Sequence, residues 1–422
     1  MQSVKFIHTG DLHLDTPFRG LSSLNNALAS RLKDATLKSF RRIIDLCVRE
    51  KVDFLLVSGD IFDSEMKSLA AQLRFVKELE RLNQQGIPAY IIAGNHDPRH
   101  SWLKELKLPQ QSYLFGADTA EYFTFEKEGE RLADIYGVSY ATQNEKRDLT
   151  RFYTRNDNPA PFSIALLHGT VGAAGPHENY VPFRLEEIRG KGFDYWALGH
   201  IHKHRVVHPA YPAVVYPGNP QGRDFGETGP RGCYMVELRE NSAPQLAFVP
   251  LQTIRFEEVT VDLNGVEDIS QLHAAIEKAI TNVAGYSDRE SYMLRIVLKG
   301  RTRLHGLLHK PGEVNQLLLL FNEGQLQQES FTWIDRIALH TLPDTDLELL
   351  KKGNDFIAEL LTVFDALEAD SAQLDAIVSY ADKEFSSPQA RKEIDELSAE
   401  EKKEIAEQAR WMLLDPLLKE EQ

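Results

Sequence analysis

The sequence is poor in cysteine, with only Cys47 and Cys233 in 422 residues. Two cysteines cannot build a disulfide framework, and neither lies at the spacing of a thiolate zinc site, so we expect both to be packing residues. Long apolar runs are also missing, since no window approaches the roughly 18 apolar residues that a membrane helix needs. The opening segment MQSVKFIHTG lacks the basic and apolar regions of a signal peptide. These absences predict a cytoplasmic protein that does not interact with a membrane.

Positive charge is scarce as well, and the deficit is uneven along the chain. The formal net charge is −15, and the stretch 343–422 alone holds 21 acidic and 9 basic residues, a net charge of −12. The rest of the chain is therefore nearly neutral. A nearly neutral body can carry a basic groove for a polyanion, whereas the acidic tail should repel one.

The first half of the chain alternates strand-like and helix-like segments. Strands are predicted at 4–10, 52–60 and 87–94, with one long helix over 27–51 and another over 68–86 between them. This alternation predicts right-handed crossovers and a largely parallel sheet. After about residue 120 the strand-like segments follow each other closely, which predicts a second sheet packed on the first.

The pattern changes near Pro250. Residues 255–341 read as strand, helix, strand, helix, strand, which predicts a small α+β module, and the remainder is helical and charged. We therefore expect three regions, at 1–245, 250–342 and 343–422. The basic run on the helix at 27–51 is interpreted as a solvated helix face. Its members are Arg31, Lys33, Lys38, Arg41 and Arg42.

Polar residues with metal-binding side chains follow five of the predicted strands. One such block alone is weak evidence, because a histidine at a strand end is usually a structural residue, and the segment after Gly94 also suits a helix N-cap. Five blocks that all follow strands favour one shared site. Carboxylate, amide and imidazole groups together suit manganese, iron or zinc better than magnesium. The blocks supply Asp11 and His13, Asp60 and Asp63, Asn95 and His96, His168, and His200 and His202.

The order of these blocks resembles the calcineurin-like metallophosphoesterases. That resemblance implies an α/β fold, a four-layer αββα sandwich of two sheets flanked by helices, here with a small α+β capping domain and a helical C-terminal tail. Within the family, FIHTGDLHLD, YWALGHIHKH and YPGNPQGRDFGETGPRGC are similar to the SbcD-type DNA repair exonucleases. DLHLDTPFRGL and GTVGAAGPHENYVPF are similar to the YhaO-like branch. The specific resemblance covers about residues 1–245.

The resemblance implies two divalent metal ions, for which we expect manganese, with iron and zinc as alternatives. The first ion would be held by Asp11, His13, Asp60 and His202. The second would be held by Asp60, Asn95, His168 and His200, so that Asp60 bridges the two ions.

Further residues receive roles beside the metals. His96 should stabilise the transition state or protonate the leaving oxygen, and Asp63 should orient it, although Asp63 could instead be a turn or cap residue. Asn219 and Arg223 are placed in the substrate groove, with a plain structural loop as the alternative. His8, His100, His204 and His208 are interpreted as structural.

The resulting functional hypothesis is a DNA nuclease, an exonuclease with endonuclease activity as an option, that works in DNA repair. The resemblance implies a homodimer and an SbcC-type, SMC-like ATPase partner held by the C-terminal helices, while the small module would place DNA. The alternatives are a phosphatase or small-molecule phosphodiesterase on the same core, and a non-catalytic scaffold. The tail has apolar residues at helical spacing, which could dock a partner or pack on the chain's own body. These are Leu350, Ile357, Leu360, Leu361, Phe364, Leu367, Ile405, Ala409, Met412, Leu413 and Leu417.

Overall fold

The computed structural model describes residues 2–14, 16, 26–63, 68–99, 107–172, 181–285, 290–353, 355–382 and 397–420. The chain divides into two compact units. The first comprises Met1–Val259, Thr281–Arg295 and Leu319–Arg336, and the second comprises Thr260–Ile280, Ile296–Leu318 and Ile337–Gln422. Among the helices in the described ranges, none combines the length and the apolar character needed to cross a membrane.

The first sheet has six strands and a parallel centre. Strands β1 to β4 run parallel, β13 is antiparallel to β1, and β14 is antiparallel to β13. This arrangement confirms the largely parallel sheet expected from the strand and helix alternation. In order across the sheet the strands are β14 (Gln245–Pro250), β13 (Gly232–Arg239), β1 (Ser3–Thr9), β2 (Phe54–Ser58), β3 (Ala89–Ile92) and β4 (Ser112–Leu114).

The second sheet also has six strands, and it confirms the prediction made from the closely spaced strands. Its centre is parallel, through β12, β10, β7 and β6, and the outer strands β11 and β5 are antiparallel to their neighbours. Across the sheet the strands are β11 (Arg205–His208), β12 (Ala213–Tyr216), β10 (Tyr195–Gly199), β7 (Phe162–His168), β6 (Glu130–Gly137) and β5 (Glu121–Lys127). A short parallel pair, β8 (Thr170–Val171) and β9 (Pro182–Phe183), follows β7.

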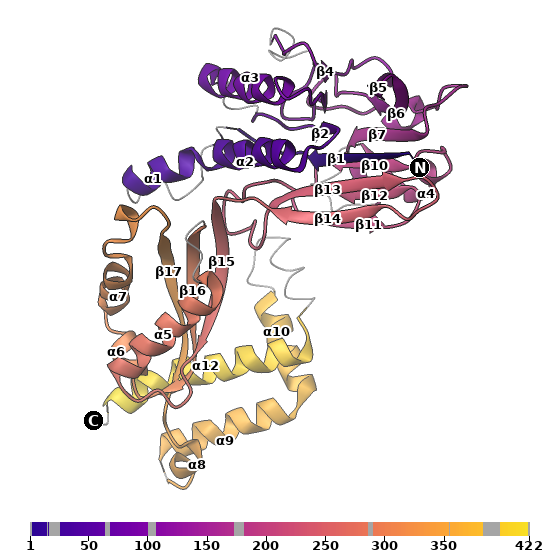
Figure 1. Cartoon of the computed structure of the whole chain (residues 1–422). Helices are drawn as coiled ribbons and strands as arrows, with labels where there is room; N and C mark the ends of the chain where they lie inside the picture. Colours follow the sequence, from indigo (N-terminus) through magenta and orange to yellow (C-terminus); the bar gives the residue numbers. More distant parts are fainter. Residues whose placement is uncertain are drawn as a thin grey trace. The chain divides into compact units, whose positions relative to one another are not determined.

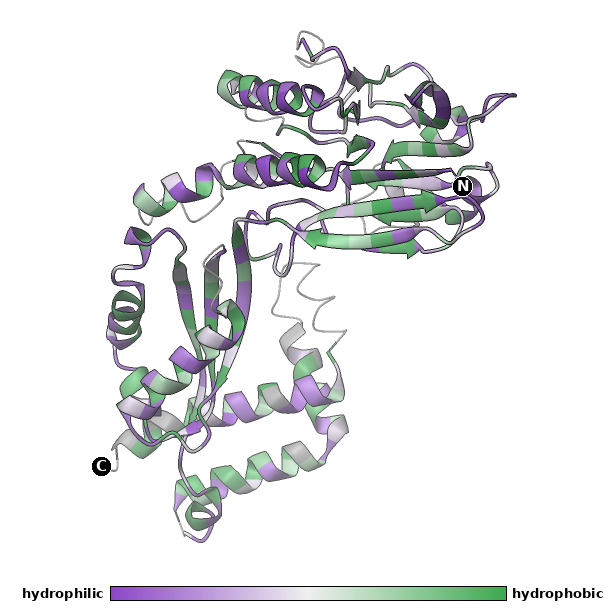
Figure 2. Cartoon of the chain, viewed as in Figure 1, coloured by the Kyte–Doolittle hydropathy of each residue, from purple (hydrophilic) through white to green (hydrophobic). Residues whose placement is uncertain are grey.

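The two sheets pack face to face, and helices cover their outer faces. Phe6 packs with Phe54 and Tyr195 in the core between the sheets, while its neighbour Ile7 points to the other side, as strand geometry requires. There α2 (Ala35–Glu50) and α3 (Leu69–Asn83) pack on the first sheet, and α4 (Leu185–Arg189) packs on the second. Figure 2 shows hydrophobic and hydrophilic residues alternating along α2 and α3, as one-sided packing requires. The expected four-layer sandwich is confirmed.

The single helix predicted over 27–51 is wrong in one respect. The structure has two helices there, α1 (Asn26–Lys33) and α2, which are separated by a turn at Asp34. Leu28 and Leu32 of α1 pack with Ile254, Met293 and other residues of the first unit rather than on the sheet that α2 covers. The two helices therefore bury their apolar faces in different cores, which a single apolar stripe does not distinguish.

The small α+β module and the helical tail follow, as predicted. Its sheet is formed by β15 (Ile254–Asp262), β16 (Ser291–Thr302) and β17 (Thr332–Pro343). Its helices are α5 (Ile269–Ala284), α6 (His305–Leu308) and α7 (Glu313–Asn322). The tail contains α8 (Leu347–Leu350), α9 (Phe356–Ala369), α10 (Ser371–Asp382) and α12 (Ala399–Glu420), all labelled in Figure 1.

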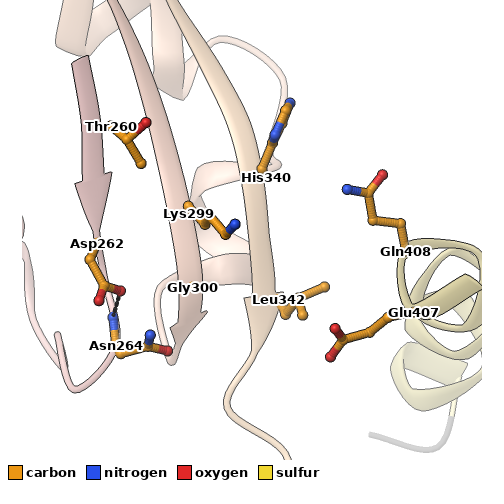
Figure 3. A pocket seen from close by; sticks show the side chains of 9 residues that line it. All are labelled: Thr260, Asp262, Asn264, Lys299, Gly300, His340, Leu342, Glu407 and Gln408. Carbon is orange, nitrogen blue, oxygen red and sulfur yellow. Dashed lines mark hydrogen bonds between the residues drawn. The ribbon is translucent and has the colours of Figure 1, made fainter. Parts of the chain in front are cut away.

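Part of the apolar stripe in the tail is buried within the tail itself. Ile357 and Leu361 of α9 pack against Trp411 and Leu414 of α12, so the alternative that the tail packs on its own chain holds for these positions. Other apolar residues of the stripe remain exposed, among them Met412 at 76%. A pocket of about 350 Å³ lies between the small sheet and α12. Figure 3 shows its lining, with Lys299 and His340 on the sheet side and Glu407 on α12.

Candidate metal centre

The seven predicted metal ligands converge at the carboxyl ends of five parallel strands. β1, β2 and β3 are neighbours in one sheet, and β7 and β10 are neighbours in the other. The structure contains three groups of three candidate donor residues, and within each group the donor atoms lie within 4.8 Å of one another. Asn95 contacts one of these groups. The groups are Asp11, His13 and His202; His13, Asp63 and His96; and Asp60, His168 and His200.

Four of the candidate ligands have a positive φ angle, a backbone conformation that residues other than glycine rarely adopt. Asp11, His13, Asp60 and His200 have φ of 50°, 43°, 51° and 98°, and they make up half of the eight described non-glycine residues with positive φ. Each such residue costs of order 1–3 kcal/mol and persists only where its surroundings enforce it. The strain is therefore concentrated where the chain turns donor atoms toward one point.

Glycines let the strand ends approach each other closely. A Cβ atom on Gly94 would lie 2.1 Å from Asp60 Oδ1, and one on Gly199 would lie 1.9 Å from the Ser58 carbonyl oxygen. Both distances are far below van der Waals contact. Gly94 therefore lets the loop after β3 approach the loop after β2, and Gly199 lets β10 of the second sheet approach β2 of the first.

The contacts of His168 show that the cluster needs a positive charge. Its Nδ1 lies 2.9 Å from the Ser58 carbonyl oxygen, which can only accept, so Nδ1 donates and Nε2 is left with a lone pair. That lone pair faces two further acceptors, Asn95 Oδ1 at 3.0 Å and Asp60 Oδ2 at 3.4 Å. Burial alone would lower the pKa of His168, but Asp60, Asp11 and the Ser58 carbonyl together outweigh burial and raise it to about 9. Either a proton or a metal ion must lie among these acceptors, and the donor set fits a divalent metal.

The second half of the cluster is also built from imidazole and carboxylate groups. His202 Nδ1 lies 2.6 Å from Glu227 Oε1 and donates to it, which leaves His202 Nε2 with a lone pair 3.2 Å from His13 Nε2. Burial, together with the charge of Arg223, lowers the pKa of His13 well below its usual value, so this imidazole is neutral, as a ligand must be. Asp60 Oδ2 lies 3.8 Å from His13 Nε2 and also faces His168. Asp60 thus occupies the position between the two halves that a bridging ligand requires.

Glu227 is a functional residue that the sequence analysis missed. Its carboxylate accepts hydrogen bonds from His202, from Arg223 Nη2 at 2.9 Å and from Asn219 Nδ2 at 2.8 Å. Burial would raise the pKa of Glu227, but the bond with His202 and the charge of Arg223 hold it far below its usual range. A carboxylate behind a ligating imidazole fixes the orientation of the ring. Its position in the block that also contains Asn219 and Arg223 was the available signal.

The two residues predicted for the substrate groove lie behind His202. Asn219 is 1% exposed, and Arg223 is largely buried against Glu227. The contacts seen here therefore position a candidate ligand. That either residue also contacts substrate stays a prediction.

His96 lies at the open side of the cluster. Its ring is 5.0 Å from that of His13, centroid to centroid, and its Nδ1 is 3.3 Å from Asp63 Oδ1. The His96 side chain is 35% exposed, whereas those of His13, Asp60 and His168 are at most 2% exposed. The hydrogen bond with Asp63 raises the pKa of His96. A protonated imidazole that is held by a carboxylate and open to solvent can deliver a proton to a bound molecule.

Asp97 is a second residue whose importance was not foreseen. It is fully buried, and its carboxylate accepts from three backbone N–H groups, those of Ile61 at 2.6 Å, Phe62 at 3.2 Å and Gly94 at 2.8 Å. These bonds tie the loop after β2 to the loop after β3. Asp97 therefore holds together the segments that carry Asp60 and Asn95.

Among the described residues, the histidines that were interpreted as structural are not part of the donor cluster. His8 is buried between Tyr195 Oη at 2.9 Å and Ser58 Oγ at 3.2 Å, and burial lowers its pKa to about 3. His204 stacks on Phe248, with ring centroids 3.9 Å apart. His100 lies outside the described residues, as do 17–21 and 173–180 of the two segments that are similar to the YhaO-like branch.

Comparison with known proteins agrees with this site. The calcineurin-like phosphoesterase family matches residues 4–204, and the middle domain of metallophosphoesterase YhaO matches residues 256–342. The chain is 35% identical to the uncharacterized metallophosphoesterase YhaO of Bacillus subtilis over 98% of each chain. The chain belongs to the YhaO family of calcineurin-like metallophosphoesterases. Membership implies a metal-dependent phosphoesterase with a dinuclear divalent metal site.

More distant relatives of this YhaO family member carry a DNA repair name. One is the DNA double-strand break repair protein Mre11 of Sulfurisphaera tokodaii, 30% identical over 49% of this chain and 51% of its own length. The protein of the same name from Saccharolobus solfataricus is 25% identical over 88% of this chain and 93% of its own length. The resemblance to SbcD-type nucleases seen in the sequence is thus accompanied by similarity to these proteins.

The role of Asp97 in joining the two loops can be tested by Asp97→Asn. The substituted amide turns an N–H₂ group toward at least one backbone N–H, which leaves a buried donor unpaired. We expect the free energy of unfolding of β2 and β3 to fall by about 1–3 kcal/mol, measured by amide hydrogen exchange. The matched control is Asp157→Asn at an exposed aspartate, which should change stability by less than about 0.5 kcal/mol. Equal effects of the two substitutions would contradict this role.

Proposed function

We propose that this protein is a two-metal-dependent DNA nuclease, an exonuclease that can also act as an endonuclease, in DNA repair. The observation that carries the proposal is the acceptor cluster around Asp60, with His96 at its open side. The names of the Mre11 relatives support DNA as the substrate. The alternative is a phosphatase or small-molecule phosphodiesterase, which the same cluster would serve.

We assign one metal ion to Asp11, His13, Asp60 and His202 and the other to Asp60, Asn95, His168 and His200, with manganese as the expected metal. Two bound ions supply an activated water and neutralise charge on the phosphate. Glu227 keeps the Nε2 lone pair of His202 directed into the site, because it accepts the proton of Nδ1. The Ser58 carbonyl does the same for His168.

His96 then acts as the general acid. It is held near the site by its backbone N–H, which donates to Asp60 Oδ1 at 2.9 Å, and by the contact of its ring with Asp63. Because its pKa is raised, the imidazole keeps its proton to a higher pH than an unperturbed histidine and can protonate the leaving oxygen of the phosphodiester.

The substrate class is tested by incubating the purified protein and manganese with end-labelled duplex and single-stranded DNA, and in parallel with nucleotide monophosphates. A nuclease should shorten the DNA and release little phosphate from the monophosphates. Release of phosphate from monophosphates with intact DNA would favour the phosphatase.

The roles proposed for Asp60 in metal binding and for His96 in acid catalysis can be tested separately by substitution. Asp60→Ala should abolish both manganese binding, measured by calorimetry, and hydrolysis, because this carboxylate faces both halves of the cluster. His96→Asn should retain manganese binding and lose about 10²–10⁴-fold in turnover, the usual contribution of a general acid. If His96→Asn also failed to bind manganese, His96 would have to be counted among the ligands.

The contact between Asp63 and His96 predicts a pH effect. A general acid works only when it is protonated, so turnover should fall as pH rises through the pKa of His96. Because the bond with Asp63 raises that pKa, Asp63→Asn should lower it and move the alkaline limb of the turnover profile to lower pH. The profile is measured with manganese and a small phosphodiester. An unmoved alkaline limb would show that His96 is not the group that titrates there.

We further propose that the tail binds an SbcC-type, SMC-like ATPase and that the protein acts as a homodimer. Supporting a docking role, α9 and α12 keep exposed apolar side chains after their own core is formed, including Phe356 at 64% and Met412 at 76%. The tail's net charge of −12 makes it a poor surface for DNA and a suitable one for a basic protein partner.

The exposed part of the stripe is tested with Met412→Glu. This substitution leaves the packing of Trp411 and Leu414 in place, so the chain should remain folded while pull-down of the candidate ATPase falls at least tenfold. The matched control is Leu319→Glu in α7, an equally exposed leucine at 74% outside the tail. Undiminished capture by the Met412 variant would show that this face is not the docking surface.

A further inference from the structure

A buried hydrogen-bonded group lies in the core between the two sheets. His8 of β1 places its Nδ1 2.9 Å from Tyr195 Oη and its Nε2 3.2 Å from Ser58 Oγ, and all three residues are buried. His8 lies on the same face of β1 as Phe6, which points into the apolar core between the sheets. Burial of an imidazole costs free energy that an apolar side chain of similar size would not lose. The two directed contacts are therefore what a histidine adds at this position.

The hydrogen atoms of this group can be assigned from its acceptors. Ser58 Oγ lies 3.2 Å from the Thr9 carbonyl oxygen and 3.1 Å from that of Leu198. Carbonyl oxygens can only accept, so the serine hydroxyl donates toward them, and its oxygen accepts from His8 Nε2. Burial lowers the pKa of His8 to about 3, so the ring is neutral and carries one hydrogen. Nδ1 of His8 therefore accepts from the Tyr195 hydroxyl.

Ser58 joins three strands just before they reach candidate ligands. It is the last residue of β2, and its hydroxyl contacts the backbone of β1 at Thr9 and of β10 at Leu198. Two residues after Thr9, Ser58 and Leu198 the chain arrives at three candidate ligands that have positive φ angles. These are Asp11, Asp60 and His200. The hydroxyl of Ser58 therefore ties together the backbone segments from which these ligands emerge.

The backbone of Ser58 contacts a fourth candidate ligand. Its carbonyl accepts from His168 Nδ1 at 2.9 Å and so directs the Nε2 lone pair of that ring into the site. The surroundings of Ser58 are tight, because a Cβ atom on Gly10 would lie 2.3 Å from its Oγ and one on Gly199 would lie 1.9 Å from its carbonyl oxygen. The side chain that His8 holds and the carbonyl that holds His168 belong to the same residue. A change at the first contact is therefore transmitted to the second.

We propose that His8 is a positioning residue of the metal centre. Its bond to Ser58 fixes the carbonyl that orients His168 and the strand end that leads to Asp60. Tyr195 completes the arrangement, because its hydroxyl holds His8 in the tautomer that donates to Ser58. The inference rests on the proposed assignment of His168 and Asp60 to the second metal ion. It gives His8 a role beyond the structural one expected from the sequence.

The test is manganese binding by the full-length protein with His8→Leu, measured by calorimetry. Leucine fills the apolar space but cannot donate to Ser58. Residues that orient metal ligands typically contribute about 10–100-fold to metal affinity, so we expect manganese affinity to fall about tenfold or more. His8→Gln carries an amide that can donate from the position of Nε2, and it should recover most of the lost affinity. A purely structural role would not produce this recovery, because glutamine packs no better than leucine in an apolar core.

Two further variants separate positioning from a general loss of stability. Ser58→Ala removes the other partner of the same hydrogen bond, so it should weaken manganese binding as His8→Leu does. The double variant should bind no more weakly than the weaker single variant, because both substitutions break one interaction. The control is Phe125→Leu, which reduces a buried side chain of the same core on β5, at the far edge of the second sheet. It should lower the unfolding temperature and leave manganese binding unchanged.

Each other result has a distinct meaning. Manganese affinity that is unchanged in Ser58→Ala, or that falls equally in Phe125→Leu, would overturn the role of His8 even if His8→Leu did not fold. A His8→Gln variant that binds as weakly as His8→Leu would contradict it as well. Wild-type protein that binds two manganese ions but cleaves no DNA would reject the proposed nuclease function and leave this inference in place.

Discussion

The site depends on one electrostatic constraint, the convergence of acceptors on Asp60 in a buried environment. His168, whose Nδ1 donates to the Ser58 carbonyl, directs the lone pair of Nε2 toward Asp60 Oδ2 and Asn95 Oδ1, and acceptors cannot pair with each other. Only positive charge makes the arrangement stable, whether it comes from protons or from divalent ions. The excess of acceptors that makes the site require positive charge is therefore also what allows it to bind metal ions.

The remainder of the first unit serves to hold this unfavourable cluster in place. Parallel strands from two sheets end at one point, and glycines at their ends allow the sheets to approach within contact distance. Asp97 joins two of the loops through backbone N–H groups, and Glu227 and the Ser58 carbonyl fix the two imidazoles. The strained φ angles of four candidate ligands show how much the surrounding core must enforce.

Charged residues in different parts of the chain have different kinds of partner. Carboxylates pair with Arg41 and Arg223, and backbone carbonyls accept hydrogen bonds from Arg31 and Arg42. Negative charge is concentrated in the tail, where α9 and α12 form a small core of their own.

The sequence alone determined the alternation of strands and helices, the two sheets, the small module, and the position of each donor after a strand. These follow from local periodicity and from the rule that parallel strands end at a common edge. Only the tertiary structure decided which residues form hydrogen bonds with one another and which are buried. Glu227 and Asp97 support the site, and Asn219 is buried, through contacts with residues distant in sequence. The same holds for the packing of Ile357 and Leu361 inside the tail and for the carbonyl partners of Arg31 and Arg42. Hydrogen-bond partners and burial are properties of the folded arrangement, and no local pattern encodes them.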